Sequence, residues 1–231
     1  MIAAYTAPTY FAGPRQGYES YASQEGALRA TYRRLLSHLA RRRMTGGALL
    51  EVGCAFGFFL DEARPFFDRR VGCDLSEAAL GEAAARADTV VLGGLADVPE
   101  SERFDCIVAT QVIEHIYDPG SFVRVALQLL KPRGWLVLAT PNIGSLWRHL
   151  LRRRWPSFKI PEHVTFFDAR TLALLFVRAG CEDVQRLPYL HAFPLAVVAE
   201  KLGIPGRLRS VEGWLWIPQT TVAFAGRRGG G

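Results

Sequence analysis

The stretch Ala48-Leu49-Leu50-Glu51-Val52-Gly53-Cys54-Ala55-Phe56-Gly57 places a short apolar strand directly before a turn that contains two glycines. A glycine immediately after a strand lets the backbone turn sharply and approach a bound ligand. Gly57 then opens a helix, whose free N–H groups can face an anionic part of a ligand. This order of strand, turn and helix predicts an open α/β sheet with a ligand site at the carboxyl ends of its strands.

Predicted helices and strands alternate along the chain on both sides of this turn. Upstream, apolar side chains at helical spacing predict a helix over about 21–43. Downstream, Ser76, Asp118 and Asp168 are suited to be N-caps of further helices, and the helix after Ser76 is expected to extend to Ala87. The predicted strands are 48–52, 70–73, 89–92, 104–110, 134–140, 182–187 and 220–225. Such alternation implies right-handed βαβ units and a parallel sheet with both faces covered by helices.

We expect the whole chain, residues 1–231, to be a single domain. Residues 1–46 would form an irregular N-terminal extension and a helix, and 47–141 would form a cofactor-binding core. The alternation breaks at 142–168 and again at 188–218, which are predicted to be irregular insertions. Long excursions in a tight fold are often functional lids, so we expect both insertions to cover the acceptor site.

The composition is that of a folded protein without a membrane span. Of the 231 residues 49% are hydrophobic and 22% charged, which allows a full core and argues against disorder. No apolar run approaches the roughly 20 residues that a membrane helix needs, and we find no signal peptide. The cysteines are widely spaced and lack a C-x-x-C pair, so neither a disulfide framework nor a metal site is expected from Cys54, Cys73, Cys106 and Cys181. We therefore expect a reduced, cytoplasmic protein.

The positive charge permits an anionic partner without identifying one. The net charge is +6, and basic residues cluster at 33–34, 41–43 and 148–154. Aromatic stacking platforms are not interleaved with them, so nucleic-acid binding is disfavoured. For the segment 147–155, WRHLLRRRW, three interpretations stay open: a lid that grips an anionic acceptor, a helix on a membrane surface, or an amphipathic helix with arginines in water.

Asp74, at the end of the second predicted strand, indicates an adenosine-containing ligand. A carboxylate at this place can accept hydrogen bonds from both hydroxyls of a ribose, or can serve the start of the next helix. The turn from Gly53 to Gly57 has the spacing G-x-x-x-G, whereas a dinucleotide site has G-x-G-x-x-G to seat a pyrophosphate. The spacing therefore disfavours a nicotinamide-dependent oxidoreductase.

With these motifs the chain resembles the class I S-adenosylmethionine-dependent methyltransferases, in particular the bacterial group that acts on small molecules. The resemblance covers roughly residues 48–183, and its motifs are 50–60, 72–76, 104–107, 112–116, 118–119, 130–134 and 139–142. It implies a Rossmann-like α/β fold with a seven-stranded, mostly parallel sheet. It also implies S-adenosyl-L-methionine as cofactor, S-adenosyl-L-homocysteine as product and a small-molecule acceptor.

The resemblance also assigns the cofactor site. Carried over, its residues are Glu51, Gly53, Ala55 and Gly57 at the methionine end, Asp74 at the ribose, Leu75, Gly94 and Leu95 around the adenine, and Gln111 beside the cofactor. Ala55 replaces a glycine of the family, and Gly94 stands where many relatives have an aspartate. Some quinone-type relatives have an acid near position 111 that takes part in a metal site. This chain has Gln111 there, so we expect no metal at Glu114 and His115. Glu51 has a second interpretation, as a carboxylate that stabilises the turn.

Two histidines are candidates for a catalytic base. A hydroxyl acceptor must lose its proton, and a side chain with a pKa near 6.5 suits that task. His115 follows the fourth strand, and His163 lies in the first insertion. Each has a structural alternative: His115 can bond a backbone carbonyl, and His163 can pack within the lid.

We therefore expect methyl transfer to a small, in some cases anionic, acceptor. Transfer to oxygen of a secondary metabolite, a sugar or a lipid-linked intermediate is preferred over N- or C-methylation, because histidine bases are present. A cofactor-binding module without catalysis is the alternative from another class. A nucleic-acid methyltransferase is disfavoured, because the fourth strand lacks the proline-aromatic motif of amino-directed DNA enzymes.

Overall fold

A computed structural model describes residues 21–201 and 213–230, so the predictions for 1–20 and 202–212 lie outside the described residues. One sheet of seven strands has the order β3-β2-β1-β4-β5-β9-β6. Its strands are β1 (Ala48–Val52), β2 (Arg69–Asp74), β3 (Thr89–Leu92), β4 (Phe104–Thr110), β5 (Leu130–Pro141), β6 (Glu182–Leu187) and β9 (Thr221–Arg227). The predicted seven-stranded sheet is confirmed, and β5 begins four residues earlier than expected.

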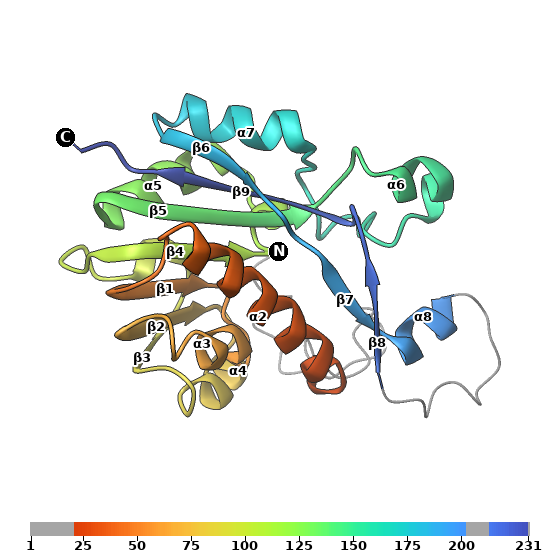
Figure 1. Cartoon of the computed structure of the whole chain (residues 1–231), viewed down its shortest axis with the longest axis horizontal. Helices are drawn as coiled ribbons and strands as arrows, with labels where there is room; N and C mark the ends of the chain where they lie inside the picture. The colour runs from red at the N-terminus through yellow and green to blue at the C-terminus, as the bar shows by residue number, and fades with distance from the viewer. Residues whose placement is uncertain (1–20, 202–212, 231) are drawn as a thin grey trace.

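The direction of the strands creates a switch point beside the glycine turn. In the seven-stranded sheet, strands β1 to β5 are parallel to one another, and β9 pairs antiparallel with both β5 and β6. The chain runs outward from β1 to β3 and then returns to β4, on the other side of β1. The carboxyl ends of the parallel strands therefore meet at one edge of the sheet (Figure 1). In such folds the ligand lies where the strand order reverses, which here is between β1 and β4.

Helices cover both faces of the sheet, as predicted. The alternation along β4 separates two cores, because Cys106 and Val108 face one and Ile107 and Ala109 face the other. The first face is covered by α2 (Glu25–Arg41), α3 (Phe58–Glu62) and α4 (Glu77–Ala83), and the second by α5 (Pro119–Leu129) and α7 (Ala169–Arg178). The predicted N-terminal helix is α2, whose apolar stripe is buried in the first core.

The predicted N-caps begin their helices as expected. Ser76 Oγ accepts a hydrogen bond from Ala79 N (3.3 Å), and Asp118 Oδ1 accepts one from Ser121 N (2.9 Å). Asp168 Oδ1 accepts one from a backbone N–H in the first turn of α7. Each cap satisfies a helical N–H that has no partner inside the helix. Helix α4 ends at Ala83, so its predicted extension to residue 87 was wrong.

The two insertions are not irregular, which corrects the prediction. Their elements are α6 (Leu146–Leu151) and the 3-10 turn η5 (Arg152–Arg154) in the first, and β7 (His191–Pro194), α8 (Leu195–Lys201) and β8 (Trp214–Ile217) in the second. β7 and β8 pair antiparallel in a sheet of their own. Local sequence does not reveal this pairing, because His191 and its partner Ile217 are far apart along the chain. Both insertions lie at the carboxyl ends of the strands (Figure 1).

Helix α2 connects these parts of the molecule. Arg29 Nη1 donates to Asp61 Oδ2 (2.8 Å) and Glu62 Oε1 (2.9 Å) on α3. Two residues further along α2, Thr31 Oγ1 accepts a hydrogen bond from Ala192 N (3.0 Å) on β7. α2 therefore contacts both the helix that follows the glycine turn and the second insertion.

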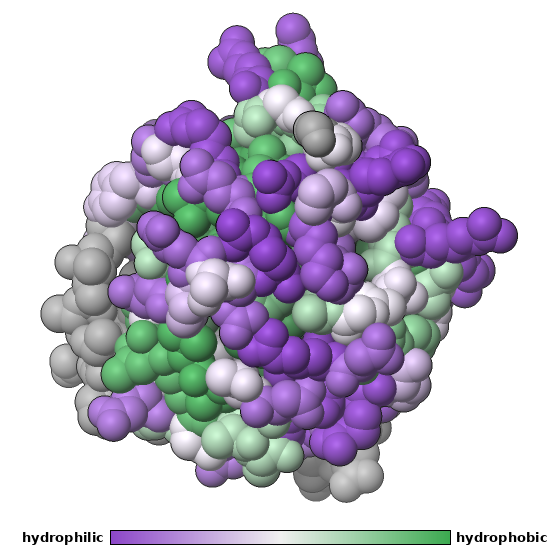
Figure 2. All heavy atoms as spheres, turned by 90° about the vertical axis from the view of Figure 1, so that its left-hand side faces the viewer, coloured by the Kyte–Doolittle hydropathy of each residue, from purple (hydrophilic) through white to green (hydrophobic). Residues whose placement is uncertain are grey.

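The opposite end of the sheet, where the parallel strands begin, is mainly hydrophilic (Figure 2). Ion pairs lie at the starts of these strands, such as Arg69 with Glu102 (2.6 Å) and Lys131 with Asp105 (2.7 Å). Among the described residues, no helix has the length and apolar character that crossing a membrane requires. The larger hollow of the described surface lies at the other end, among the insertions.

Gly57 gives a first testable prediction about the fold. Its φ is +75°, and an added Cβ would lie 3.1 Å from Ala83 Cα, so α3 and α4 approach closely only because this side chain is absent. We expect Gly57→Ala to lower the free energy of unfolding by about 1–2 kcal/mol in urea denaturation. Gly81, exposed inside α4 with no atom near its Cβ direction, is the matched control, and Gly81→Ala should raise stability by about 0.5–1 kcal/mol. Equal stability of Gly57→Ala and the wild type would show that neither the positive φ at Gly57 nor its close approach to Ala83 requires a glycine.

Candidate functional site

A cavity of about 770 Å³ opens at the carboxyl ends of β1, β2 and β4. Its walls come from the core of the sheet, from α2 and from both insertions. Most predicted site residues line it together: Gly53, Ala55, Asp74, Leu75, Gly94, Leu95, Gln111, His115 and His163. Glu51 and Gly57 are not among the described lining residues.

The glycine turn has a conformation that favours residues without a large side chain. Gly53 has φ +70°, and an added Cβ would lie 2.6 Å from Val112 Cγ2. Ala55 also adopts a left-handed conformation, with φ +45°. The Ala55 N–H donates to Asp74 Oδ2 (2.8 Å), which holds the alanine in this unfavourable region. The turn therefore presents backbone, with almost no side chain, to the cavity.

Asp74 is built into the site from both sides. Its Oδ1 accepts a hydrogen bond from Ser76 N (2.9 Å), and its Oδ2 accepts the one from Ala55. Burial raises the pKa of this carboxyl, and the backbone hydrogen bonds oppose that shift. Since each carboxylate oxygen has two lone pairs, Asp74 retains acceptor capacity toward the cavity.

Glu51 is almost fully buried, with 2% of its surface exposed. Burial, and after it the charge of Asp74, raise the pKa of Glu51 well above its usual range. One carboxyl oxygen is bonded by the backbone of Leu60 in α3, and Oε2 has no partner among the described residues. This geometry fits the interpretation of a carboxyl group that stabilises the turn and the start of α3.

The loop after β3 contains two residues that the sequence reasoning missed. Asp97 Oδ2 accepts a hydrogen bond from Gly94 N (2.8 Å) and thereby shapes the 3-10 turn η3 (Leu95–Asp97). Gly93 N donates to Asp74 O (2.8 Å), and an added Cβ at Gly93 would lie 2.4 Å from Asp97. The three-residue spacing from Gly94 to Asp97 is that of a capping carboxylate and was the available signal.

Gln111 brings an unsatisfied polar group to the site. It has φ +58°, its backbone N–H donates to Ala139 O (2.7 Å), and its side chain lines the cavity. The amide nitrogen Nε2 is buried with no partner among the described residues. Since an unpaired buried donor is costly, this amide is suited to meet an acceptor atom of a ligand.

The two predicted histidines lie against one another, although they are far apart in sequence. Glu162, the residue before His163, is already 47 positions after His115. The rings of His115 and His163 are T-shaped, with centroids 4.7 Å apart. His115 Nδ1 lies 3.0 Å from Glu162 O, so Nδ1 carries the proton and Nε2 the lone pair. Burial lowers the pKa of His115. Burial, and after it the charges of His115 and Lys159, lower the pKa of His163 to about 4.

Glu114 lies beside this pair in the 3-10 turn η4 (Ile113–His115). Burial raises its pKa to about 7, and its Oε2 accepts a hydrogen bond from Thr140 Oγ1 (2.9 Å). Potential metal-ligating atoms of Glu114, His115 and His163 all lie within 4.8 Å of one another. The expectation that the chain has no metal site therefore stays a prediction that needs a direct test.

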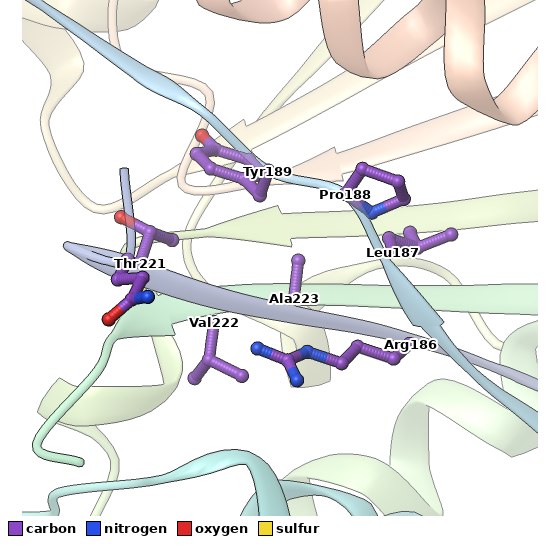
Figure 3. Close-up of a pocket in the computed structure, with 8 residues that line it drawn as sticks. Arg186, Leu187, Pro188, Tyr189, Thr221, Val222 and Ala223 are labelled. Carbon is purple, nitrogen blue, oxygen red and sulfur yellow. The ribbon is translucent and has the colours of Figure 1, made fainter. Parts of the chain in front are cut away.

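A second cavity, of about 320 Å³, lies where β6 ends and β9 begins (Figure 3). Tyr189 and Ala223 lie on one side of β9, and Val222 and the Arg186 side chain on the other. Burial, and after it Tyr32, Glu114 and Glu51, raise the pKa of Tyr189, which keeps its phenol neutral. Without carboxylates or histidines in its described lining, this cavity offers little chemistry, and the larger cavity is the candidate active site.

The comparisons with known proteins agree with this geometry. The family profile described as "Methyltransferase domain" matches residues 23–186. A protein of Mycolicibacterium smegmatis named "Probable S-adenosylmethionine-dependent methyltransferase" is 30% identical over 164 residues, which cover 70% of this chain and 62% of the relative. A "Ubiquinone biosynthesis O-methyltransferase" of Bradyrhizobium diazoefficiens is 28% identical over 121 residues, 50% of this chain and 44% of the relative. This chain thus matches less than two thirds of the length of either relative.

The fold also matches solved structures. A SAM-dependent methyltransferase of Thermotoga maritima aligns with a TM-score of 0.61 at 18% identity. The alignment covers 90% of this chain and 94% of that one. At this identity the likeness concerns the fold alone, and it extends over nearly the whole chain.

Proposed function

Because this chain belongs to the class I S-adenosylmethionine-dependent methyltransferases, we propose that it transfers the methyl group of S-adenosylmethionine to a small molecule held in the larger cavity. The observation that carries the proposal is the position of Asp74. Its carboxylate clamps the left-handed turn at Ala55 and still faces the cavity at the switch point of the sheet.

The residues present fit this cofactor. Asp74 would accept hydrogen bonds from the ribose hydroxyls, and the Gly53 turn would admit the methionine end, since Gly53 has no Cβ, which would collide with the Val112 side chain. The loop at Gly94 and Leu95 would flank the adenine. The Gln111 amide nitrogen, which has no partner among the described residues, would donate a hydrogen bond to an acceptor atom of the cofactor. When bound, S-adenosylmethionine supplies a methyl carbon that its sulfonium makes electrophilic.

The remaining part of the cavity would hold the acceptor. The cavity lining includes His115, His163 and Lys159, and also His191 and Phe193 of the second insertion. These walls would surround the acceptor, align it with the methyl group and exclude water. Alignment and exclusion of water are the main contributions of a protein to methyl transfer. We place oxygen first among acceptor atoms, because a related protein is named as an O-methyltransferase and a base is at hand.

His115 is the better candidate for that base. Its Nδ1–H is held by the Glu162 carbonyl, so Nε2 is the nitrogen that accepts a proton from the acceptor hydroxyl. His163, with a pKa of about 4, is a weak base near neutral pH. We infer that His163 orients the acceptor or His115. A nitrogen acceptor that is already neutral would need no such base.

The proposal is tested first by calorimetric titration of the full chain with S-adenosylhomocysteine, S-adenosylmethionine and NAD. We expect binding of the two adenosyl sulfur compounds and none of NAD, because the turn has no third glycine to seat a pyrophosphate. A preference for NAD, or no binding of either class, would refute the proposal.

Transfer of a labelled methyl group to a panel of hydroxyl and amine acceptors, with and without a chelator, then separates three cases. Transfer that survives the chelator supports the metal-free mechanism. Loss on chelation would assign a metal to the Glu114, His115 and His163 group. Cofactor binding without transfer to any acceptor would favour a binding module.

A further inference from the structure

Helix α6 and the turn η5 form an apolar and cationic surface that has no place in the cofactor site. We define the α6–η5 surface by Leu146, Trp147, Leu150 and Leu151 together with Arg152, Arg153 and Arg154. Leu146 and Leu150 are 68% and 70% exposed, and Trp147 and Leu151 are also exposed. Exposed apolar groups that are gathered on one element usually mark an interaction surface.

The apolar side chains share one face of the helix. Leu146 and Leu150 are four residues apart, as are Trp147 and Leu151, and residues four apart are neighbours on a helix surface. None of the residues of α6 is buried in the domain. In Figure 1 the helix stands away from the sheet, at the carboxyl ends of the strands. The domain itself therefore does not use this apolar face.

The charge next to this face is uniformly positive. Arg152, Arg153 and Arg154 are all exposed, and none of the ion pairs found in residues 21–201 and 213–230 includes them. An apolar helix face with a tryptophan, bordered by exposed arginines, is complementary to a surface that is apolar below and anionic at its boundary. An anionic lipid bilayer has these two properties together.

The surface is held in place at both of its ends. Trp147 Nε1 donates to Pro218 O (2.8 Å), which fixes α6 beside the second insertion. Trp155, directly after η5, is buried against Phe158 and Phe166, with a centroid distance of 5.1 Å to Phe158. The first insertion, which contains α6, η5 and Trp155, then reaches the cavity at Lys159 and His163.

We propose that the α6–η5 surface binds an anionic lipid bilayer and holds the mouth of the acceptor site against it. Binding does not depend on methyl transfer. We further infer that the acceptor is an amphiphile drawn from the bilayer, and this second part of the proposal rests on the proposed function. The first part explains why four large apolar side chains face water beside three arginines.

The experiment is sedimentation of the full chain with vesicles of phosphatidylcholine alone and of equimolar phosphatidylcholine and phosphatidylglycerol. We expect binding to the anionic vesicles that weakens as salt screens the arginines. Arg153→Glu should weaken binding by about five-fold or more, and Leu150→Ser by about ten-fold. S-adenosylhomocysteine affinity should be unchanged in both variants, which shows that each is folded.

Helix α7 provides matched controls, because Val177 and Arg178 are also exposed. Val177→Ser and Arg178→Glu replace an exposed apolar side chain and an exposed arginine by the same serine and glutamate on another face, and both should bind vesicles like the wild type. Absence of vesicle binding by the wild type, or equal losses in the α6 and α7 variants, would overturn the proposal. So would a dimer in sedimentation velocity that Leu150→Ser dissociates without any vesicle binding, because a second copy would then cover the surface. Each of these results is independent of whether methyl transfer is found.

Discussion

Replacing Asp74 with alanine is expected to weaken S-adenosylhomocysteine binding by about 10- to 100-fold. The carboxylate would contribute charge-assisted hydrogen bonds to the ribose worth roughly 1.5–3 kcal/mol. Its removal also frees the Ala55 N–H, so the left-handed conformation of Ala55 loses the bond that holds it. Both effects act on the same turn and reduce affinity together. Isothermal calorimetry of the variant measures the loss without any knowledge of the acceptor.

Asp168→Ala is the matched control for this substitution. Like Asp74, Asp168 accepts a backbone N–H at the start of a helix, but it caps α7 and is not part of the described cavity lining. The control should lose about 1 kcal/mol of stability and keep its affinity for S-adenosylhomocysteine. If Asp74→Ala folds and binds like the wild type, the ribose assignment is wrong.

Replacing His115 with alanine is expected to lower kcat by about 10²- to 10⁴-fold with a hydroxyl acceptor, the usual contribution of a general base. Affinity for S-adenosylhomocysteine should stay within about two-fold, because the proposed role begins only when the acceptor is bound. His163→Ala is expected to raise KM more than it lowers kcat, since His163 would orient rather than accept the proton. Steady-state kinetics with the acceptor found in the labelled-methyl screen separates the two histidines.

The pH dependence of the wild type checks the same assignment. Protonated His115 cannot accept a proton, so kcat should fall as the pH falls through the pKa of His115. Because burial lowers that pKa below 6.5, kcat should be flat above about pH 7. The acidic limb should disappear in His115→Ala. Unchanged kcat in both histidine variants would leave alignment alone as the source of catalysis.

The fold was predictable where the local preferences of the sequence agree with the burial and contacts of the tertiary structure. The strands β1 and β4 are buried on both faces because helices cover both, so their sequences are mainly apolar, with Glu51 and Asp105 as the charged exceptions. Ser76, Asp118 and Asp168 were visible because a cap is a local contact between a side chain and a backbone N–H close by in sequence. These features need no knowledge of distant residues.

Long-range contacts explain what the sequence did not show. The end of α4 at Ala83 follows from tertiary contacts, because Gly57 packs against Ala83 and Arg86 Nη1 turns to donate to Phe56 O (2.9 Å). Residues 84–87 on their own favour a helix. The pairing of β7 with β8 likewise depends on a partner far along the chain.

Most of the residues predicted for the site line one cavity, and their roles stay predictions, whereas their mutual contacts were not predictable from the sequence. The motifs brought Asp74, Gln111 and both histidines to one cavity, as expected. The clamp between Asp74 and Ala55 could not be read from spacing, because it depends on the angle at which the turn leaves β1. The contact between the two imidazole rings likewise requires the first insertion to fold back over η4. Hydrogen bonds from Val164 N and Thr165 N to Glu114 O hold it there.

Helix α2, which bonds to α3 through Arg29 and to β7 through Thr31, also lines the larger cavity, so in the proposed site it would form a common wall for cofactor and acceptor. Two ligands become thermodynamically linked when binding of one alters a wall that the other contacts. Any factor by which the cofactor tightens acceptor binding must return as the same factor in the affinity for the cofactor. If cofactor binding shifts α2, this helix outside the sheet would carry the occupancy of one half of the proposed site to the other.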